Sequence, residues 1–152
     1  MDYDERLHAP LRWWVQGTML VASLWLATVV ALPAIASWIV TGTAMALLAA
    51  LLLSYGAARV TVADGTFRAG RARIAGHHLG TAVALDAEAT RRAGGVEADA
   101  RAFLLLRPYL KRSVKVEVAD PADPTPYWLV STRHPEELAR ALVSLNESSP
   151  AG

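Results

Sequence analysis

Residues 13–33 read WWVQGTMLVASLWLATVVALP, and residues 37–56 read SWIVTGTAMALLAALLLSYG. Between Arg12 and Arg59 the chain has 46 residues without a single Asp, Glu, Lys or Arg. Because one membrane crossing takes about 20 apolar residues, this run is long enough for two crossings. Pro33 acts as a helix stop, and the short turn that follows it forces the two segments to be antiparallel. The run therefore predicts a transmembrane helical hairpin.

Aromatic residues stand near the ends of the two predicted spans. Trp13 and Tyr55 are expected at one membrane interface and Trp38 at the other, as in the aromatic belts of membrane proteins. Trp14 is expected at the same interface as Trp13. Trp25 is then expected in the middle of the membrane, where its indole N–H needs a hydrogen-bond partner.

Two short patterns within the run each allow two interpretations. Gly42 and Ala46 form a small-xxx-small pair that permits close helix packing, although small residues are common in such helices without that role. Ala34-Ile35-Ala36 has the A-x-A form of a signal-peptidase site. The first 12 residues, however, carry three acids against two arginines, and a second apolar segment follows at once. We therefore interpret the run as an uncleaved anchor.

Charge outside the run predicts its orientation. The turn between the two segments carries no charge, whereas arginines such as Arg6, Arg12 and Arg59 lie near their other ends. The positive-inside rule then places both termini in the cytoplasm of a multi-pass protein of the plasma (inner) membrane. The absence of cysteine is compatible with a reducing compartment.

From residue 57 onward the apolar pattern changes to a period of two, which indicates β-strands. Val60 and Val62 share one face, and Asp64-Gly65 is a typical hairpin turn. Further strands are expected in RARIAG (71–76), LGTAVALD (79–86), RAFLLLRPYL (101–110), RSVKVEVAD (112–120) and PYWLVST (126–132), with a loop or short helix over 87–100.

The stretch DPADPTPYWLVSTRHP (120–135) holds four of the eight prolines. Its two Asp-Pro pairs predict turns, and Pro126 suits the first position of a strand. Pro135 suits the first turn of a helix that carries leucines at helical spacing. The residues predicted to be buried together are Leu104, Leu106, Val114, Val116, Val118, Trp128, Val130, Leu138 and Leu142.

The predicted fold class is an α+β membrane protein, in which the transmembrane hairpin precedes a small antiparallel β-barrel or sandwich of the pleckstrin-homology-like (PH-like) type. The domains are a cytoplasmic N-terminal tail (1–12), the hairpin (13–56), a cytoplasmic PH-like domain (57–146) ending in a helix (135–146), and a disordered tail (147–152). An analogy at the level of fold implies no function.

Four long stretches carry a resemblance to a known family. These are ERLHAPLRWW (5–14), DGTFRAGRARI (64–74), GVEADARAFLLLRPYLKRSVKVEV (95–118) and DPADPTPYWLVSTRHPEELARAL (120–142). Together they resemble an actinobacterial family of small membrane proteins known only as a domain of unknown function. The resemblance implies an integral membrane protein and brings no catalytic residue with it.

Residues able to perform catalysis are present but do not form a convincing set. Ser131, His134 and Asp123 are the elements of a hydrolase triad, yet no Gly-x-Ser-x-Gly surrounds the serine. Helix capping explains the Ser131–His134 region more simply. We predict no catalytic residue and no enzymatic activity.

His77 and His78 are candidate metal ligands, together with Asp64 or Asp86. On an extended segment, however, His77 and His78 are expected to point to opposite faces. No cysteine and no H-x-x-x-H spacing supports a site. We predict no metal site and no cofactor.

Basic residues give the strongest functional signal. Residues 59–118 contain 11 Lys or Arg against 6 acids, whereas residues 119–152 contain 2 against 5. A basic patch next to an anionic leaflet gains about 1 kcal/mol per side chain near the surface; ordinary positive-inside bias on a mixed surface is the simpler alternative. The candidate lipid- or partner-binding residues are Arg68, Arg71, Arg73, Arg107, Lys111, Arg112 and Lys115.

These features favour a membrane-tethered, non-catalytic interaction module that contacts anionic lipid headgroups of the inner leaflet or an envelope-associated membrane-protein partner. An accessory or regulatory subunit of a larger membrane complex is the alternative, followed by an enzyme acting on lipid. The spans contain no ionisable residue that would indicate transport. Nucleic acid is not expected as a partner, since no recognition motif is present.

Overall fold

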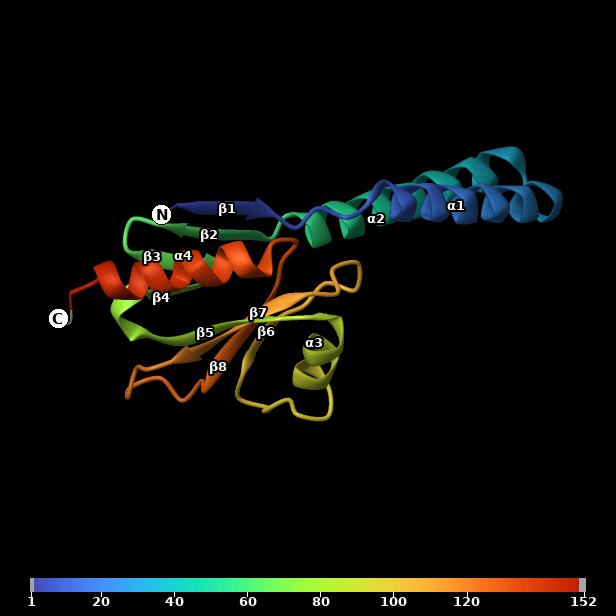
Figure 1. Cartoon of the computed structure of the whole chain (residues 1–152). Helices are drawn as coiled ribbons and strands as arrows, with labels where there is room; N and C mark the ends of the chain where they lie inside the picture. Colours follow the sequence, from blue (N-terminus) through green and yellow to red (C-terminus); the bar gives the residue numbers. More distant parts are fainter. Residues whose placement is uncertain (1, 151–152) are drawn as a thin grey trace. The chain divides into compact units, whose positions relative to one another are not determined.

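The uncharged run folds into two antiparallel helices, α1 (Leu11–Ala31) and α2 (Ala34–Gly56) (Figure 1). Pro33 is the N-cap residue of α2, in agreement with its predicted role between the helices. Both helices are long and apolar enough to cross a membrane. In the computed structural model, which describes residues 2–150, the chain divides into two compact units. His8–Ala57 form the helical hairpin, and Met1–Leu7 with Ala58–Gly152 form what we call the β unit.

Inside the hairpin, Gly17 allows the two helices to approach each other closely. A Cβ atom at this position would lie 2.7 Å from the Cδ2 atom of Leu48. At Gly42 an added Cβ would meet nothing within 4 Å, and Ala46 is exposed. The interpretation of Gly42 and Ala46 as a packing pair is therefore wrong for this hairpin, because both residues lie on its outer surface.

Aromatic rings pair across the hairpin in two places. The ring centroids of Trp13 and Tyr55 lie 6.3 Å apart, as expected for residues at the same end. Those of Trp25 and Trp38, which stands in the first turns of α2, lie 5.7 Å apart. Among the described residues, the buried indole N–H of Trp25 has no hydrogen-bond partner, although one was expected. Nearby, the hydroxyl groups of Thr28 and Ser37 form a 2.8 Å hydrogen bond.

The first sheet of the β unit has the order β1-β2-β3-β4 and is antiparallel throughout. Its strands are β1 (Tyr3–Arg6), β2 (Arg59–Ala63), β3 (Thr66–Ala69) and β4 (Ala72–Ala75). Asp64 and Gly65 both have positive φ, as in a type I′ turn, which confirms the predicted hairpin. Gly70 has φ +61° at the first position of the next two-residue turn, where glycine adopts this conformation without strain.

Strand β1 lies in a segment that was predicted to be a tail, and that prediction is wrong. Tyr3–Arg6 pair with β2 in the register Tyr3↔Val62 to Arg6↔Arg59. The backbone N–H of Leu7 extends the ladder by donating to the carbonyl of Ala58 at 3.0 Å. The helical hairpin is thus inserted between two neighbouring strands of one sheet.

The second sheet has the order β5-β7-β8-β6. It follows the short 3-10 helix η1 (Gly76–His78) and consists of β5 (Leu79–Leu85), β6 (Phe103–Leu105), β7 (Ser113–Val118) and β8 (Tyr127–Ser131). Strand β6 is parallel to β8, whereas a purely antiparallel arrangement was expected. The segment predicted to be a loop or short helix contains α3 (Ala87–Gly94), which is capped by the Asp86 carboxylate.

The proline-rich stretch forms the connection from β7 to β8, as predicted. The carboxylates of Asp120 and Asp123 accept hydrogen bonds from the backbone N–H groups of Ala122 and Thr125, both at 2.9 Å. The last helix, α4 (Pro135–Ser148), begins at the predicted proline. It continues two residues into the expected disordered tail, of which residues 151–152 lie outside the described residues.

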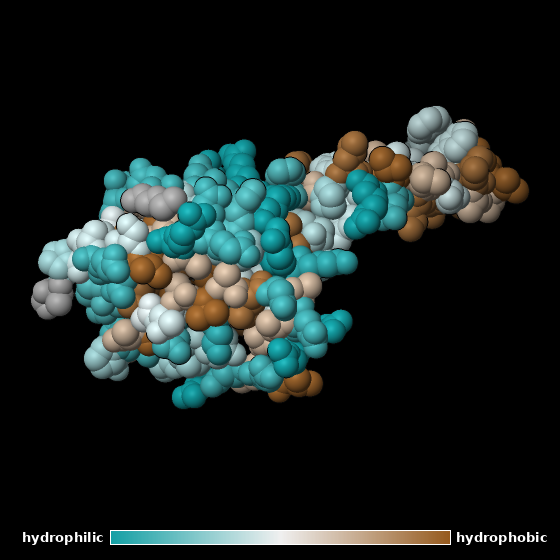
Figure 2. Space-filling view, in the orientation of Figure 1, coloured by the Kyte–Doolittle hydropathy of each residue, from teal (hydrophilic) through white to brown (hydrophobic). Residues whose placement is uncertain are grey.

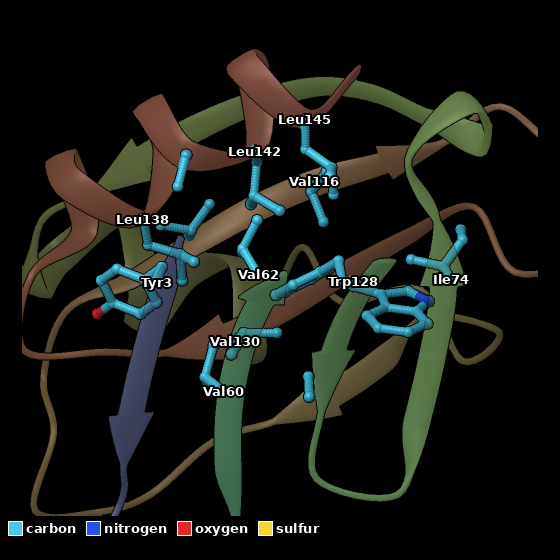
Figure 3. Packing of buried hydrophobic residues seen from close by; sticks show 14 of the residues in the cluster. Tyr3, Val60, Val62, Ile74, Val116, Trp128, Val130, Leu138, Leu142 and Leu145 are labelled. Atoms are coloured by element: carbon cyan, nitrogen blue, oxygen red, sulfur yellow. The ribbon is translucent and has the colours of Figure 1, made fainter. Parts of the chain in front are cut away.

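One core joins the inner faces of both sheets and α4 (Figure 3). Of the residues predicted to be buried, Val114, Val116, Trp128, Val130, Leu138 and Leu142 belong to this core, with Val118 at its edge. Leu104 is 39% exposed, and Leu106 packs in a second cluster instead. Phe103 and Leu105 pack against the main core in place of Leu104 and Leu106. Three consecutive leucines, Leu104 to Leu106, show no alternation of polar and apolar residues. The sequence therefore does not indicate which side chains of this strand face the core.

Replacing residues 8–57 with Asn-Gly should give a soluble, folded β unit, because Leu7 and Ala58 already form the hydrogen-bonded pair that closes a two-residue hairpin. The fragment 58–150, which lacks β1, should be far less stable. It loses the buried Tyr3 and Leu7 side chains, each contributing about 1.5–3 kcal/mol. Urea unfolding followed by circular dichroism compares the two proteins, and equal midpoints would show that β1 contributes nothing.

Candidate functional site

The chain leaves the β unit at Leu7 and returns to it at Ala58, and these two residues are hydrogen-bonded neighbours. We call this end of the β unit the exit end. The β3–β4 turn lies at the same end, because the N–H of Gly70 donates to the carbonyl of Arg59 at 2.9 Å. Strands β2, β4 and β7 begin near the exit end and run away from it.

Two segments of the second sheet also reach the exit end. In the loop 106–112, the Tyr109 hydroxyl donates to the carbonyl of Leu7. The guanidinium of Arg112 donates to the carbonyl of Arg133 at 2.8 Å, and that of Arg133 donates to the carbonyl of Arg6 at 3.0 Å. These bonds hold the loop against the point where the chain leaves the β unit.

The two ends of the β unit therefore differ in charge. Seven basic residues gather at the exit end, namely Arg6, Arg59, Arg71, Arg107, Lys111, Arg112 and Arg133, beside the acids Asp4, Glu5, Asp86, Glu88, Glu136 and Glu137. Four of these acids lie at helix N-termini, and the other two, Asp4 and Glu5, bind Arg59 and Arg133. The opposite end carries Asp64, Glu117, Asp120, Asp123 and Glu147. Basic charge thus surrounds the point of exit.

The structure separates the predicted binding residues into three groups. Arg71, Arg107, Lys111 and Arg112 lie at the exit end. Arg68 and Arg73 face one another across β3 and β4 on the solvent side of the first sheet. Lys115 lies in the middle of β7, with its ammonium group 4.4 Å from the centroid of the Tyr127 ring. The seven residues do not form one patch.

A cluster of polar groups that the sequence did not reveal lies beside the exit end. The Glu5 carboxylate accepts hydrogen bonds from the hydroxyls of Tyr3 (2.6 Å) and Thr132 (2.5 Å). It also accepts from the backbone N–H of Arg133 at 3.0 Å, and the Arg133 guanidinium lies 3.4 Å away. The Glu5 side chain is only 9% exposed. The cluster ties β1 to the segment between β8 and α4.

Burial by itself would raise the pKa of Glu5. The hydrogen bonds from Thr132, Tyr3 and the Arg133 backbone, together with the Arg133 charge, outweigh this effect and hold the pKa below its ordinary value. Burial and the neighbouring Glu5 carboxylate raise the pKa of the Tyr3 hydroxyl. Glu5 therefore stays ionised inside the fold, where it acts as an acceptor for several donors.

The residues weighed as a catalytic triad do not meet. Ser131 is fully buried at one end of β8, and its hydroxyl accepts a hydrogen bond from the backbone N–H of Arg107 at 3.0 Å. Asp123 precedes the other end of the five-residue strand, about 16 Å away at the usual rise per residue. His134 is exposed and is the N-cap residue of α4, but it makes no side-chain capping bond.

The two histidines lie side by side, contrary to the expectation of opposite faces. They occupy η1 rather than an extended segment, and their ring centroids are 4.0 Å apart. The Nε2 atom of His78 lies 3.9 Å from a carboxylate oxygen of Asp120. Within residues 2–150, no group of three or more His, Cys, Asp or Glu side chains is arranged to hold a metal ion.

Replacing Glu5 with Gln should lower the free energy of unfolding by about 1–3 kcal/mol at neutral pH, because bonds to a charged acceptor are lost. The lowered pKa means that the unfolded state binds the proton more tightly. The stabilisation by Glu5 is therefore complete above the ordinary pKa of a glutamate, about 4.3, and is lost as the pH falls through the lower pKa of Glu5 in the folded state. Urea titrations of the detergent-solubilised chain from pH 7 to pH 3 should show a steeper acid loss in the wild type than in Glu5→Gln.

Glu117→Gln is the matched control, because Glu117 is exposed at the opposite end of the β unit. It should leave both the stability and its pH dependence unchanged. If Glu5→Gln and the wild type lose stability in parallel on acidification, the ionised Glu5 does not hold β1 in place.

Comparison with known proteins agrees with the family resemblance seen in the sequence. No curated protein matches the chain, and no solved structure matches it. A family match extends over residues 2–142 and so includes β1, the helical hairpin, both sheets and the first half of α4. The chain belongs to the family described as protein of unknown function (DUF3093).

Proposed function

We propose that this chain is a two-pass protein of the plasma membrane, with both termini in the cytoplasm, and that its β unit is a non-catalytic interaction module. Its basic exit end rests against the anionic headgroups of the inner leaflet. A PH-like closure of the two sheets, with α4 over the shared core, is part of this proposal. The proposal rests above all on the basic residues that surround the point where the chain leaves the β unit.

The surface of the helical hairpin supports insertion into a membrane. Large apolar side chains are exposed along both helices, for example Leu20 (74%), Val30 (87%) and Leu47 (66%). Figure 2 shows hydrophobic side chains on the surface of the hairpin, whereas much of the β unit is hydrophilic. A helix in the core of a soluble protein would be covered by other parts of the protein. In the most apolar 18-residue stretches of α1 and α2, however, only 0% and 11% of the residues are buried. Lipid is the solvent that such a surface requires.

Strand β1 argues against a cleaved signal sequence. Cleavage after Ala36 would remove Tyr3–Arg6 from the first sheet and Leu7 from the core. It would also leave Thr132 and Arg133 without the Glu5 carboxylate that they bind. An uncleaved anchor keeps all of these contacts.

The sheet also supports a common side for both ends of the hairpin. Leu7 and Ala58 are adjacent, so α1 must start and α2 must end on the same side of any membrane that the two helices cross. Because the arginines of the exit end lie on that side, the positive-inside rule favours the cytoplasm.

Short connections keep the exit end close to the bilayer. Residues 8–10 separate Leu7 from α1, and Ala57 alone separates α2 from Ala58. Three extended residues span at most about 10 Å, which is close to the screening length at physiological ionic strength. Each basic side chain at this distance gains about 1 kcal/mol from an anionic surface.

Orientation can be tested by cysteine labelling, because the natural chain contains no cysteine. Ile35→Cys lies at the hairpin turn and Glu147→Cys near the end of α4, and both positions are exposed. In intact cells a membrane-impermeant maleimide should label Ile35→Cys only, and after permeabilisation it should label both. Labelling of Glu147→Cys in intact cells would contradict the orientation.

Contact with headgroups can be tested by amide hydrogen exchange in nanodiscs. The loop 106–112 should exchange more slowly when phosphatidylglycerol is mixed with phosphatidylcholine than in phosphatidylcholine alone. The protection should disappear at high salt, since it depends on exposed charges. Lys111→Glu should reduce it, whereas the matched change Arg140→Glu in the middle of α4 should not. Protection that ignores lipid charge would mean that the exit end does not bind headgroups.

A further inference from the structure

The solvent side of the first sheet carries a set of arginines separate from the loop 106–112. Side chains alternate along each strand, so the neighbours of the buried Val60, Val62 and Phe67 point away from the core. The outward positions, which we call the arginine face, hold Asp4, Arg6, Arg59, Thr61, Ala63, Thr66, Arg68, Arg73 and Ala75, with Arg71 in the adjoining turn. The face is basic overall, because one acid, Asp4, stands against these arginines, and its remaining side chains are small.

Four of these arginines form two directly opposed pairs. Ala69 and Ala72 close the two-residue β3–β4 turn, which makes the next pair, Arg68 and Arg73, a non-hydrogen-bonded one. Leu7 and Ala58 are hydrogen-bonded, so the next pair along that ladder, Arg6 and Arg59, is also non-hydrogen-bonded. At such positions the side chains of two strands approach most closely.

Like charges directly opposite one another destabilise a sheet. On this face Arg59 forms an ion pair with Asp4, with 3.0 Å between the guanidinium nitrogen and the carboxylate oxygen. Asp4 therefore relieves the Arg6–Arg59 pair. The Arg68–Arg73 pair has no acid beside it in the register of the sheet, where its other neighbour is Thr61.

We propose that the arginine face binds an acidic polypeptide segment of a partner protein at the membrane surface. This rests on the proposed function, in which the exit end already faces the bilayer. Arg6, Arg59 and Arg71 are shared with the exit end. Arg68 and Arg73 lie one residue inside the strands and point to the solvent side of the sheet, so a bilayer under the exit end does not by itself cover this pair. No aromatic side chain stands at its outward positions, whereas single-stranded nucleic acid requires stacking platforms.

Carboxylates suit the arrangement because guanidinium groups bind them in a bidentate manner. The two arginine pairs lie two strand spacings apart and two residues apart along the strands, which corresponds to roughly 12 Å. Acidic side chains four residues apart on an extended segment point to the same face and span about this distance. Thr61 and Ala63 between the pairs leave room for such a segment to lie close to the sheet.

The test uses the full chain in phosphatidylcholine nanodiscs at low salt, with a fluorescent oligoglutamate peptide as the probe. Fluorescence anisotropy should detect binding that weakens roughly tenfold in the double variant Arg68→Glu/Arg73→Glu. The double variant Arg91→Glu/Arg140→Glu changes the net charge equally at exposed positions outside both surfaces and should bind as the wild type does. Asp4→Asn, which frees Arg59, should bind more tightly.

Stability supplies a second readout that a purely structural role would not produce. Arg73→Glu replaces a like-charged pair with an opposite-charged one, so it should raise the Tm of the β unit while it weakens peptide binding. A lower Tm would overturn the inferred strain. No peptide binding by the wild type, or equal loss in both double variants, would overturn the site.

Two further outcomes would assign the face to another partner and overturn the proposal. One is tighter binding of a single-stranded oligonucleotide than of the peptide. The other is loss of the phosphatidylglycerol-dependent protection of loop 106–112 in Arg68→Glu/Arg73→Glu, which would make the face a lipid site. If the wild type never shows that protection, the result contradicts the proposed function. It leaves the test of the peptide site unaffected.

Discussion

The pairing of β1 with β2 is the constraint on which the rest of the structure depends. It closes the first sheet with Tyr3 and Leu7, and it brings Glu5 to the donors of Thr132 and Arg133. It also fixes the ends of the helical hairpin side by side, since Leu7 and Ala58 share a hydrogen bond. The four residues of β1 thereby determine where both helices leave the β unit.

The distribution of charge follows from the same topology. Strands that begin or end beside Leu7 and Ala58 place their flanking arginines at one end, while the Asp-Gly turn and the Asp-Pro turns collect acids at the other. The whole chain has a net charge of only +1, so composition conceals this polarity. Electrostatic orientation of a tethered unit depends on such a separation of charge rather than on its sum.

Much of the fold follows from local sequence patterns. The uncharged run, the Asp64-Gly65 turn and Pro135 each act over a few residues, and each led to the correct element. Strand β1 could not be predicted in this way, because its only partner lies more than 50 residues away. The alternation of Tyr3, Glu5 and Leu7 was a signal, but four residues beside a charged terminus resemble a tail.

The candidate site was predictable only in part, and for the same reason. Arginine-rich segments are visible in the sequence, but their grouping depends on which strands pair. Arg133 joins the exit end through contacts with Glu5 and Arg6, both at the other end of the chain. Arg68 and Arg73 become opposed only because Gly70 permits a two-residue turn. Long-range register therefore decides which charges act together.

The position of β1 has a consequence for biosynthesis. Ribosomes complete roughly 5–20 residues per second, so β1 waits several seconds for β2, and the intervening segment is the helical hairpin. Bringing the ends of a flexible segment of this length together carries an entropic cost. A folded hairpin removes most of that cost by holding its two ends close. Docking of Tyr3 and Leu7 into the core of the β unit is therefore coupled to the folding of the hairpin.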